Sequence, residues 1–297
     1  MNYPHNNFYE MLSSSEKEHG SRPVIFIDEK KITYSEFKKD VDKFASYLQH
    51  NGIKRGDKIA LILPNCDEFV TAIFSATAIG AVVVPLNPQL KAREYEYILN
   101  NCEAKLLITS KMLKKEVSNL KLITPLTEVI WVDGEDGIKF SDTLTYPQSD
   151  YNLSYSSIDE LAVIIYTSGT TGNPKGVMLS FKNIFSNIIG GSELFELTKK
   201  DRFIVYLPMS HAFSFSIMIM LPFYNGASMV VMRSILPFSN IIKQVLLKRV
   251  TIFLGVPDVY NSLIKAKLPW YFMWFNAIRI FISGASPLSE DTLNRIP

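Results

Sequence analysis

The segment Tyr166-Thr-Ser-Gly-Thr-Thr-Gly-Asn-Pro-Lys-Gly176 decides the interpretation of this sequence. It directly follows the apolar run Leu161–Tyr166 and contains three glycines, four Ser or Thr hydroxyls and one lysine. Glycines allow several backbone N–H groups to approach one anion from the same side. Hydroxyl groups add hydrogen-bond donors, and a lysine adds positive charge suited to phosphate. The segment therefore predicts a loop that binds a polyphosphate.

This loop has two alternative interpretations, a Walker A loop and a hairpin without a ligand. A Walker A loop places Ser or Thr after a Gly-Lys pair, whereas here Pro174 precedes Lys175 and Gly176 follows it. A polar hairpin without a ligand, between residues 161–166 and Val177-Met-Leu, is the second interpretation. The order of the glycine, hydroxyl and lysine residues argues against it.

Short apolar runs alternate with amphipathic stretches on both sides of this loop. Runs such as Ile59–Leu63 and Ala81–Val84 are typical of parallel strands covered on both faces. We expect strands at 23–27, 31–34, 58–63, 81–85, 105–109, 161–166, 203–207, 227–232, 251–254 and 278–282. We expect helices at 67–79, 93–100, 183–189, 212–220, 239–248 and 256–265, and another capped by Ser35. This alternation predicts an α/β fold with mainly parallel sheets flanked by helices.

The segment 133–157 interrupts the alternation, because it is rich in Asp, Gly, Ser and Tyr and has no clear period. We therefore expect two sub-domains, at approximately residues 1–155 and 156–297.

Composition excludes several classes of protein. The 297 residues include 31 Lys+Arg and 29 Asp+Glu, which gives a net charge of +2. This balance argues against a nucleic-acid-binding protein, because binding to phosphates requires a concentrated basic face. Cys66 and Cys102 have no metal-ligand spacing, and Met1–Asn7 lacks the pattern of an export signal, so we expect a cytoplasmic protein. Residues 203–232 carry no Lys, Arg, Asp or Glu, but Pro and Asn-Gly breaks favour buried core over a membrane span or a transporter.

Residues 166–177 resemble the signature of the adenylate-forming, AMP-binding superfamily, which includes acyl-CoA synthetases, aryl-CoA ligases, luciferases and peptide-synthetase adenylation domains. Leu207-Pro-Met-Ser-His-Ala-Phe213 is similar to the family element Leu-Pro-x-x-His, and Ile282-Ser-Gly-Ala-Ser-Pro-Leu-Ser289 to its Ser-Gly-Gly-Ala-Pro-Leu element. The resemblance runs along essentially the whole chain, including residues 56–65 and 80–87. It implies the fold of the large N-terminal domain of acyl-CoA synthetases, without its end and without the small C-terminal domain.

The resemblance also implies an activity: a carboxylate attacks the α-phosphate of ATP, and a thiol then displaces AMP. The implied cofactors are ATP, Mg²⁺ and coenzyme A. The implied phosphate-binding residues are Ser168, Gly169, Thr170, Thr171, Gly172 and Lys175, with Thr167 as the Mg²⁺ ligand. The implied adenine-binding residues are Gly284, Ala285 and Ser286, and those near the acyl group are His211, Val256 and Pro257. Lys175 and His211 are the implied catalytic residues, His211 for positioning; the alternative for His211 is a cap of the helix 212–220.

Family members continue well beyond the point that corresponds to Pro297, with an acidic metal ligand, a ribose-binding aspartate and a mobile domain that carries a lysine. None of these motifs occurs in the sequence. We therefore expect this chain on its own to be a truncated, inactive or impaired part of a ligase.

The acid that is activated is predicted from two apolar stretches, Phe213–Leu221 and Trp270–Phe275. A medium- or long-chain fatty acid bound in an apolar tunnel would explain both. Ordinary core is the alternative for both, and peripheral membrane contact is a second alternative for Trp270–Phe275. Alternative functions are an acyl-ACP synthetase acting with acyl carrier protein, an aryl-acid ligase, and a non-catalytic module that binds nucleotide or acyl groups.

Overall fold

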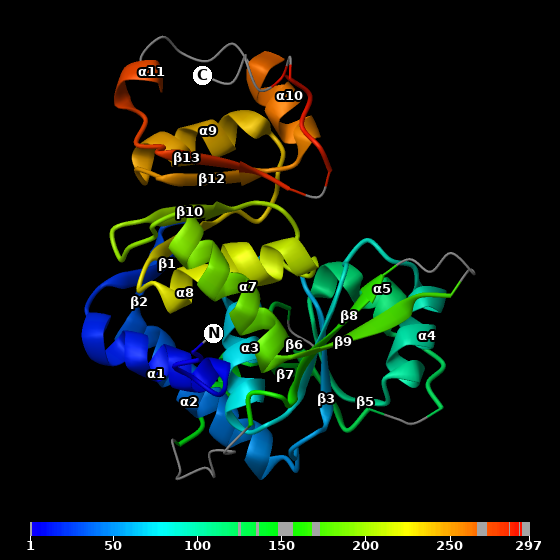
Figure 1. The fold of residues 1–297 in the computed structure, drawn as a ribbon. Helices are drawn as coiled ribbons and strands as arrows, with labels where there is room; N and C mark the ends of the chain where they lie inside the picture. Colours follow the sequence, from blue (N-terminus) through cyan, green and yellow to red (C-terminus); the bar gives the residue numbers. More distant parts are fainter. Residues whose placement is uncertain are drawn as a thin grey trace.

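A computed structural model describes residues 2–123, 126–134, 137–147, 157–167, 173–265, 272–284, 286–290 and 292. The chain forms two sheets, which we call sheet A and sheet B (Figure 1). Sheet A has the order β13-β12-β10-β11-β1-β2 and consists of β1 (Pro23–Ile27), β2 (Lys30–Thr33), β10 (Arg202–Val205), β11 (Ser228–Val231), β12 (Ile252–Gly255) and β13 (Ile280–Ser283). Sheet B has the order β7-β6-β5-β3-β4-β8-β9 and consists of β3 (Lys58–Ile62), β4 (Val82–Leu86), β5 (Ala104–Thr109), β6 (Glu128–Trp131), β7 (Ile138–Lys139), β8 (Leu161–Thr167) and β9 (Lys175–Ser180).

Both sheets are mainly parallel, as the alternation of strands and helices predicts. Among the described strands, only the pairs β1–β2 and β8–β9 are antiparallel. The sheets do not divide the chain near residue 156, however. β8 returns to pair with β4 through Val83 and Val163, and β1 pairs with β11 through Ile25 and Met229. Each predicted sub-domain therefore contributes strands to both sheets.

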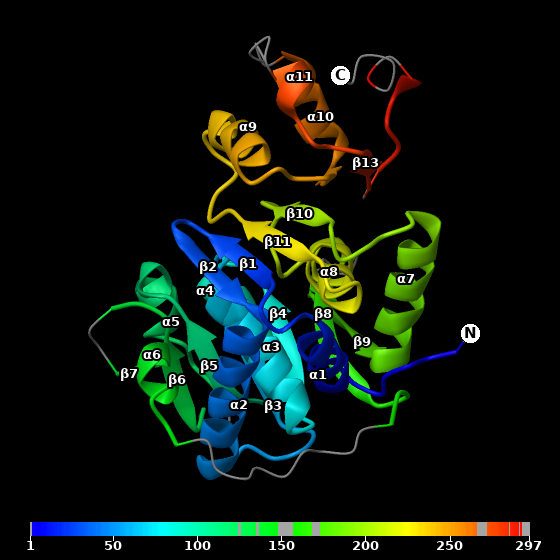
Figure 2. The same cartoon turned by 90° about the vertical axis from the view of Figure 1, so that its left-hand side faces the viewer.

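Helices form three layers around the two sheets. The central layer lies between the sheets and contains α1 (Phe8–His19), α2 (Tyr34–His50), α3 (Asp67–Ala78), α7 (Phe181–Leu194) and α8 (Leu221–Tyr224) (Figures 1 and 2). The outer face of sheet B carries α4 (Ala92–Asn101), with η1 (Lys111–Leu113) and α5 (Lys114–Val117) beside it. The outer face of sheet A carries α9 (Phe238–Leu247), α10 (Pro257–Lys265) and α11 (Phe272–Phe275), and α6 (Phe140–Thr143) packs beside α2. One buried cluster joins the inner faces of both sheets, so they share a core.

The N-cap of α2 lies two residues before the predicted cap, Ser35. Thr33 accepts a hydrogen bond from the backbone N–H of Glu36 at 3.2 Å, and the Glu36 carboxylate accepts one from the backbone N–H of Thr33 at 2.8 Å. This reciprocal capping box starts α2 at Tyr34. The prediction of Ser35 as the cap was wrong; its hydroxyl donates to Glu16 at 2.7 Å instead.

The apolar stretches differ in their burial. Residues Ser214–Met220 form a single π-helical segment, and most of their side chains belong to the central core. Among the described residues no helix is both long and apolar enough to span a membrane. In α11 Phe272 is buried, but Trp274 is 80% and Phe275 is 69% exposed, so the core interpretation of Trp270–Phe275 is wrong for these two rings. Trp270 and Tyr271 lie outside the described residues.

Candidate active site

Thr167 and Lys175 of the phosphate-loop motif belong to the antiparallel strands β8 and β9. Thr167 ends β8, Lys175 begins β9, and the two residues are paired in register with exposed side chains. The predicted phosphate-binding residues 168–172 between them lie outside the described residues. Because β8 is parallel to β4, Thr167 at the end of β8 lies at the carboxyl edge of sheet B, where ligands of parallel α/β sheets usually bind.

The glycine that follows Lys175 has a packing role in this hairpin. A Cβ atom at Gly176 would lie 2.9 Å from Cγ2 of Ile164 and 3.0 Å from Cζ of Tyr166. Only glycine therefore allows β9 to lie this close to the side chains of β8. The hairpin predicted for the unliganded interpretation is present, and its strands hold Thr167 and Lys175 opposite each other.

The segment that contains His211 connects β10 to the π-helical segment. The backbone N–H of His211 donates to the carbonyl of Pro208 at 3.1 Å, and the His211 carbonyl accepts from Phe215 N–H at 2.8 Å. The imidazole is exposed and makes no hydrogen bond within the described part of the chain. Helical structure begins at Ala212, so His211 occupies the position directly before it and its carbonyl accepts the first helical hydrogen bond, as the cap alternative expects, although its imidazole caps no backbone N–H among the described residues.

The predicted acyl-pocket and adenine residues meet at the carboxyl edge of sheet A. Gly255 and Ser283 are paired at the ends of β12 and β13, and Gly284 N–H donates to the Gly255 carbonyl at 3.1 Å. Val256 and Pro257 follow β12 directly and lead into α10. Ser286 is exposed, and Ala285 lies outside the described residues.

A close packing contact joins the His211 segment to the adenine motif. A Cβ atom built on Gly284 would lie 2.6 Å from Cε2 and 2.7 Å from Cζ of Phe213. The Phe213 ring therefore lies directly against the Gly284 backbone. The structure thus brings together the segments that contain His211, Val256, Pro257 and Gly284.

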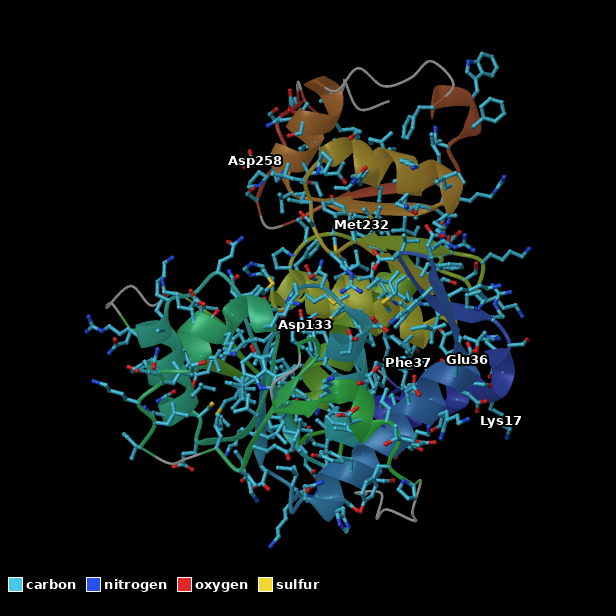
Figure 3. All side chains as sticks on the ribbon, turned by 180° about the vertical axis from the view of Figure 1, so that it is seen from behind. Lys17, Glu36, Phe37, Asp133, Met232 and Asp258 are labelled. Carbon is cyan, nitrogen blue, oxygen red and sulfur yellow. The ribbon has the colours of Figure 1, made fainter. Side chains whose placement is uncertain are left out.

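Asn65, which the sequence analysis did not single out, connects the two sheets at this edge. It follows β3 of sheet B, is 6% exposed, and hydrogen-bonds to the carbonyls of Leu207 and Met232, which lie just beyond β10 and β11 of sheet A. Figure 3 labels Met232, the residue that follows β11, in a view from behind. The signal in the sequence was the place of Asn65 at the end of residues 56–65, a segment of the family resemblance, and that segment did not indicate a role for the side chain.

Two buried tyrosines hydrogen-bond to the backbone near the carboxyl ends of β12 and β13. Tyr206 donates its hydroxyl hydrogen bond to the Leu254 carbonyl, and Tyr260 donates to the Ile282 carbonyl at 2.7 Å. Burial raises the pKa of both phenols above the ordinary value. Both side chains are therefore neutral donors at physiological pH, and they hold β12 and β13 rather than transfer protons.

A cavity of about 690 Å³ lies on the outer face of sheet B, beside the same hairpin. It is lined by Tyr166, Gly176 and Met178 of the hairpin and by Lys58 and Val82 of the neighbouring strands. His211, Val256 and Gly284 do not line it. The segments brought together at the edge of sheet A are therefore separate from this cavity.

Comparison with known proteins shows the family of the chain. The family model of the AMP-binding enzyme matches residues 12–296. A long-chain-fatty-acid–CoA ligase of Bacillus subtilis is 25% identical over 97% of this chain and 57% of its own length. A medium-chain fatty-acid–CoA ligase of Escherichia coli is 31% identical over 87% of this chain and 47% of its own length. The chain thus spans about half the length of these curated relatives.

Solved structures show the same fold. The N-terminal domain of FACL13 from Mycobacterium tuberculosis superposes with a TM-score of 0.88 at 24% identity, covering 98% of this chain and 72% of that one. A long-chain-fatty-acid-CoA ligase, FadD1, from Archaeoglobus fulgidus gives 0.91 at 24% identity, covering 99% and 61%. The predicted fold class is therefore confirmed, and with the match over residues 12–296 the chain belongs to the AMP-binding enzyme family.

Proposed function

We propose that this chain provides the ATP- and acid-binding part of an acid–thiol ligase of the acyl-CoA synthetase type. In the first step a carboxylate oxygen bonds to the α-phosphorus of ATP, and the bond from that phosphorus to pyrophosphate breaks. In the second step the sulfur of coenzyme A bonds to the acyl carbon and AMP leaves. The observation that carries this proposal is the convergence of the His211, Val256 and Gly284 segments at the edge of sheet A, together with the family match.

Lys175 and the hydroxyls of the hairpin tip would hold the phosphates that leave. Both Lys175 and Thr167 are exposed at the tip, so a polyphosphate can reach them from solvent. A hydrogen bond between a lysine and a charged phosphate is worth about 1.5–3 kcal/mol. We infer that Lys175, with residues 168–172, offsets the repulsion between the attacking carboxylate and the triphosphate.

A Mg²⁺ ion fits this tip only with ligands from the nucleotide. Mg²⁺ in ATP sites uses one or two protein oxygens and completes its shell with phosphates and water. Thr167 offers one exposed hydroxyl, and the described residues contain no cluster of three His, Cys, Asp or Glu side chains for a metal. When bound, Mg²⁺ would neutralise phosphate charge beside Thr167.

His211 would act by position rather than by proton transfer. The carboxylate that attacks is already ionised at neutral pH, so the first step requires no general base. An exposed imidazole at the edge of sheet A can donate a hydrogen bond to the acid or the adenylate. We infer that this bond orients the carboxylate toward the α-phosphorus, next to Val256 and Pro257 of the acyl side.

For the acid we propose a medium- or long-chain fatty acid. The support is the pair of relatives that are named as fatty-acid–CoA ligases. The apolar run Phe213–Leu221 lends less support, because most of its side chains are fully packed in the core and only Phe213 and Ile217 are partly buried. Other relatives are named feruloyl-CoA synthase and 4-coumarate–CoA ligase at 28% identity, so aryl acids belong in the test.

Binding of ATP tests the proposal directly. We expect the chain to bind ATP in calorimetry, and Lys175→Ala to weaken binding by about 10- to 100-fold, since one charge-assisted hydrogen bond is lost. Lys182→Ala is the matched control: Lys182 is an exposed lysine on α7, paired with Asp159 at 3.2 Å, and its loss should change ATP affinity less than twofold. Absence of ATP binding, or equal losses in both variants, would contradict the proposed site.

The acid is identified by acid-dependent exchange of labelled pyrophosphate into ATP in the native gene product. We expect decanoate and palmitate to support exchange and ferulate not to. Exchange with ferulate alone would establish an aryl-acid ligase instead. Transfer to coenzyme A, followed as thioester formation, then tests the proposed acceptor.

A further inference from the structure

We propose that Asn65 is a positioning residue for acid activation, which acts by holding the turn that carries His211. This inference rests on the proposed function. Asn65 lies on sheet B and His211 on the segment after sheet A, so the two come together only in the fold. Nothing in the local sequence around either residue indicates the connection.

The Asn65 amide makes three hydrogen bonds to backbone groups in the segments that follow β10 and β11 of sheet A. Its Nδ2 donates to the Leu207 carbonyl at 3.0 Å and to the Met232 carbonyl at 3.1 Å. Its Oδ1 accepts from the backbone N–H of Met209 at 3.0 Å. Both ends of the amide are therefore used, which fixes its orientation.

Two of these three bonds reach the turn before His211. Leu207 and Met209 flank Pro208, which has no N–H and whose carbonyl accepts from His211 N–H at 3.1 Å. Asn65 thus hydrogen-bonds to the turn at Leu207 and at Met209. The hydrogen bond from His211 N–H to the Pro208 carbonyl closes the turn itself. Met209 is 1% exposed, so its backbone bond to Asn65 is shielded from water.

His211 depends on this support because its side chain has none of its own. The imidazole is exposed and has no hydrogen-bond partner in the described residues. Its direction therefore follows from the backbone of the turn and from the packing of Phe213 against Gly284. A shift of about 1 Å in a positioning group can cost on the order of 100-fold in rate.

A purely structural role is the alternative, because Asn65 also ties sheet B to the end of β11 through Met232. The two roles differ in what they affect. A structural defect would weaken ATP and acyl-adenylate binding alike and would add to the effect of losing His211. A positioning role would affect only ligands that His211 contacts, and only while His211 is present.

The test measures ligand binding to the full chain and does not require turnover. Four proteins are compared: wild type, Asn65→Ala, His211→Ala and the double variant. The probes are ATP and 5′-O-(N-decanoylsulfamoyl)adenosine, a stable mimic of an acyl-adenylate. We expect Asn65→Ala to weaken the mimic at least tenfold and ATP less than threefold, and the double variant to bind the mimic no more weakly than His211→Ala.

Asn100→Ala is the matched control. Asn100 is also an amide that bridges two backbone groups, the Lys121 carbonyl at 3.4 Å and the Ile123 N–H at 2.8 Å, but it lies on α4. Its loss should leave the affinity for the mimic unchanged. If Asn65→Ala does not fold, Asn65→Asp serves in its place, because it keeps the acceptor for Met209 N–H and replaces both donors.

Several outcomes would overturn the inference. Additive losses in the double variant, or equal losses for ATP and the mimic, would make Asn65 a structural residue only. An unchanged affinity in Asn65→Ala or in His211→Ala would remove the proposed route through His211. A wild-type chain that binds neither ATP nor the mimic would refute the proposed function itself, and this result is recognised before any variant is made.

Discussion

Replacing Gly284 by alanine should destabilise the protein only while Phe213 is present. The added Cβ would lie 2.6 and 2.7 Å from two ring carbons of Phe213, and the three nearest atoms all belong to that ring. Carbon atoms pack at about 3.5–4.0 Å, so the ring must retreat by about 1 Å. Overpacking of this kind costs about 1–3 kcal/mol, and we expect the lower half of that range because the ring is only partly buried.

Gly284→Ala also has a stabilising effect on the protein, which opposes the cost of overpacking. Gly284 does not have a positive φ, so alanine fits its backbone. Replacing glycine by alanine at such a site restricts the unfolded chain and stabilises by about 0.4–1 kcal/mol. Gly284→Ala should therefore lower stability in the wild type by up to about 1.5 kcal/mol and raise it in a Phe213→Ala background.

Thermal unfolding of wild type, both single variants and the double variant measures this coupling without any ligand. At about 2–4 °C per kcal/mol for a chain of this size, we expect the effect of Gly284→Ala to differ by about 2–8 °C between the two backgrounds. Gly190→Ala on α7 is the control, because a Cβ there meets no atom within 4 Å. It should stabilise both backgrounds equally. An equal effect of Gly284→Ala in both backgrounds would refute the packing of Phe213 against Gly284.

Other predictions follow from burial and charge. Asp201 is 4% exposed and accepts hydrogen bonds from Arg279 and two threonines, but the Arg279 side chain is 38% exposed and water can hydrate it when the carboxylate is removed. Asp201→Ala should therefore cost about 1–3 kcal/mol in thermal unfolding. Asp159→Ala, in an exposed pair, should cost less than about 1 kcal/mol, and equal costs would contradict the reasoning. Burial alone would raise the pKa of Asp201, but the bonds from Arg279 and the threonines outweigh it and lower that pKa. The ionised Asp201 carboxylate therefore stabilises the folded protein fully above the ordinary carboxyl pKa, and this stabilisation is lost as the pH falls through the lower pKa of the folded state. The difference in melting temperature between wild type and Asp201→Ala should shrink below about pH 4. Trp274→Ser should change stability by less than about 0.5 kcal/mol, because the ring is 80% exposed, and reduced flotation with vesicles would indicate membrane contact. Burial raises the pKa of the Cys102 thiol to about 11, so iodoacetamide at pH 8 should label it only after unfolding, as read by intact mass.

Short-range pattern predicted the strands well and the ends of helices less well. The apolar runs at 58–63 and 81–85 became β3 and β4 with shifts of one residue, because buried parallel strands are recognisable from composition alone. The cap of α2 was placed two residues late, because Thr33 and Ser35 are both good capping residues. Only the position of Glu36, three residues after Thr33, distinguishes them.

The predicted helix at 212–220 illustrates a different limit. Its apolar pattern is satisfied by an α-helix or by the wider π-helix that the structure has at Ser214–Met220. Periodicity does not separate the two, because the choice depends on packing against the rest of the core. The division into sub-domains near residue 156 was likewise not predictable from local pattern alone. It depends on which strands pair, and the paired strands lie far apart in the chain.

The sequence by itself determined the family and the parallel α/β class, because each depends on residue types within a few positions of one another. The pairing of β8 with β9, which holds Thr167 opposite Lys175, came from the structure and not from the residue order. Only the tertiary structure decided which segments form the site. The Phe213 ring meets Gly284 and the Asn65 amide meets Leu207, 142 residues away, because two sheets share one core and place their carboxyl edges together. A contact of that kind leaves no periodic trace in the sequence, since it is made by the backbone of one partner and a single side chain of the other.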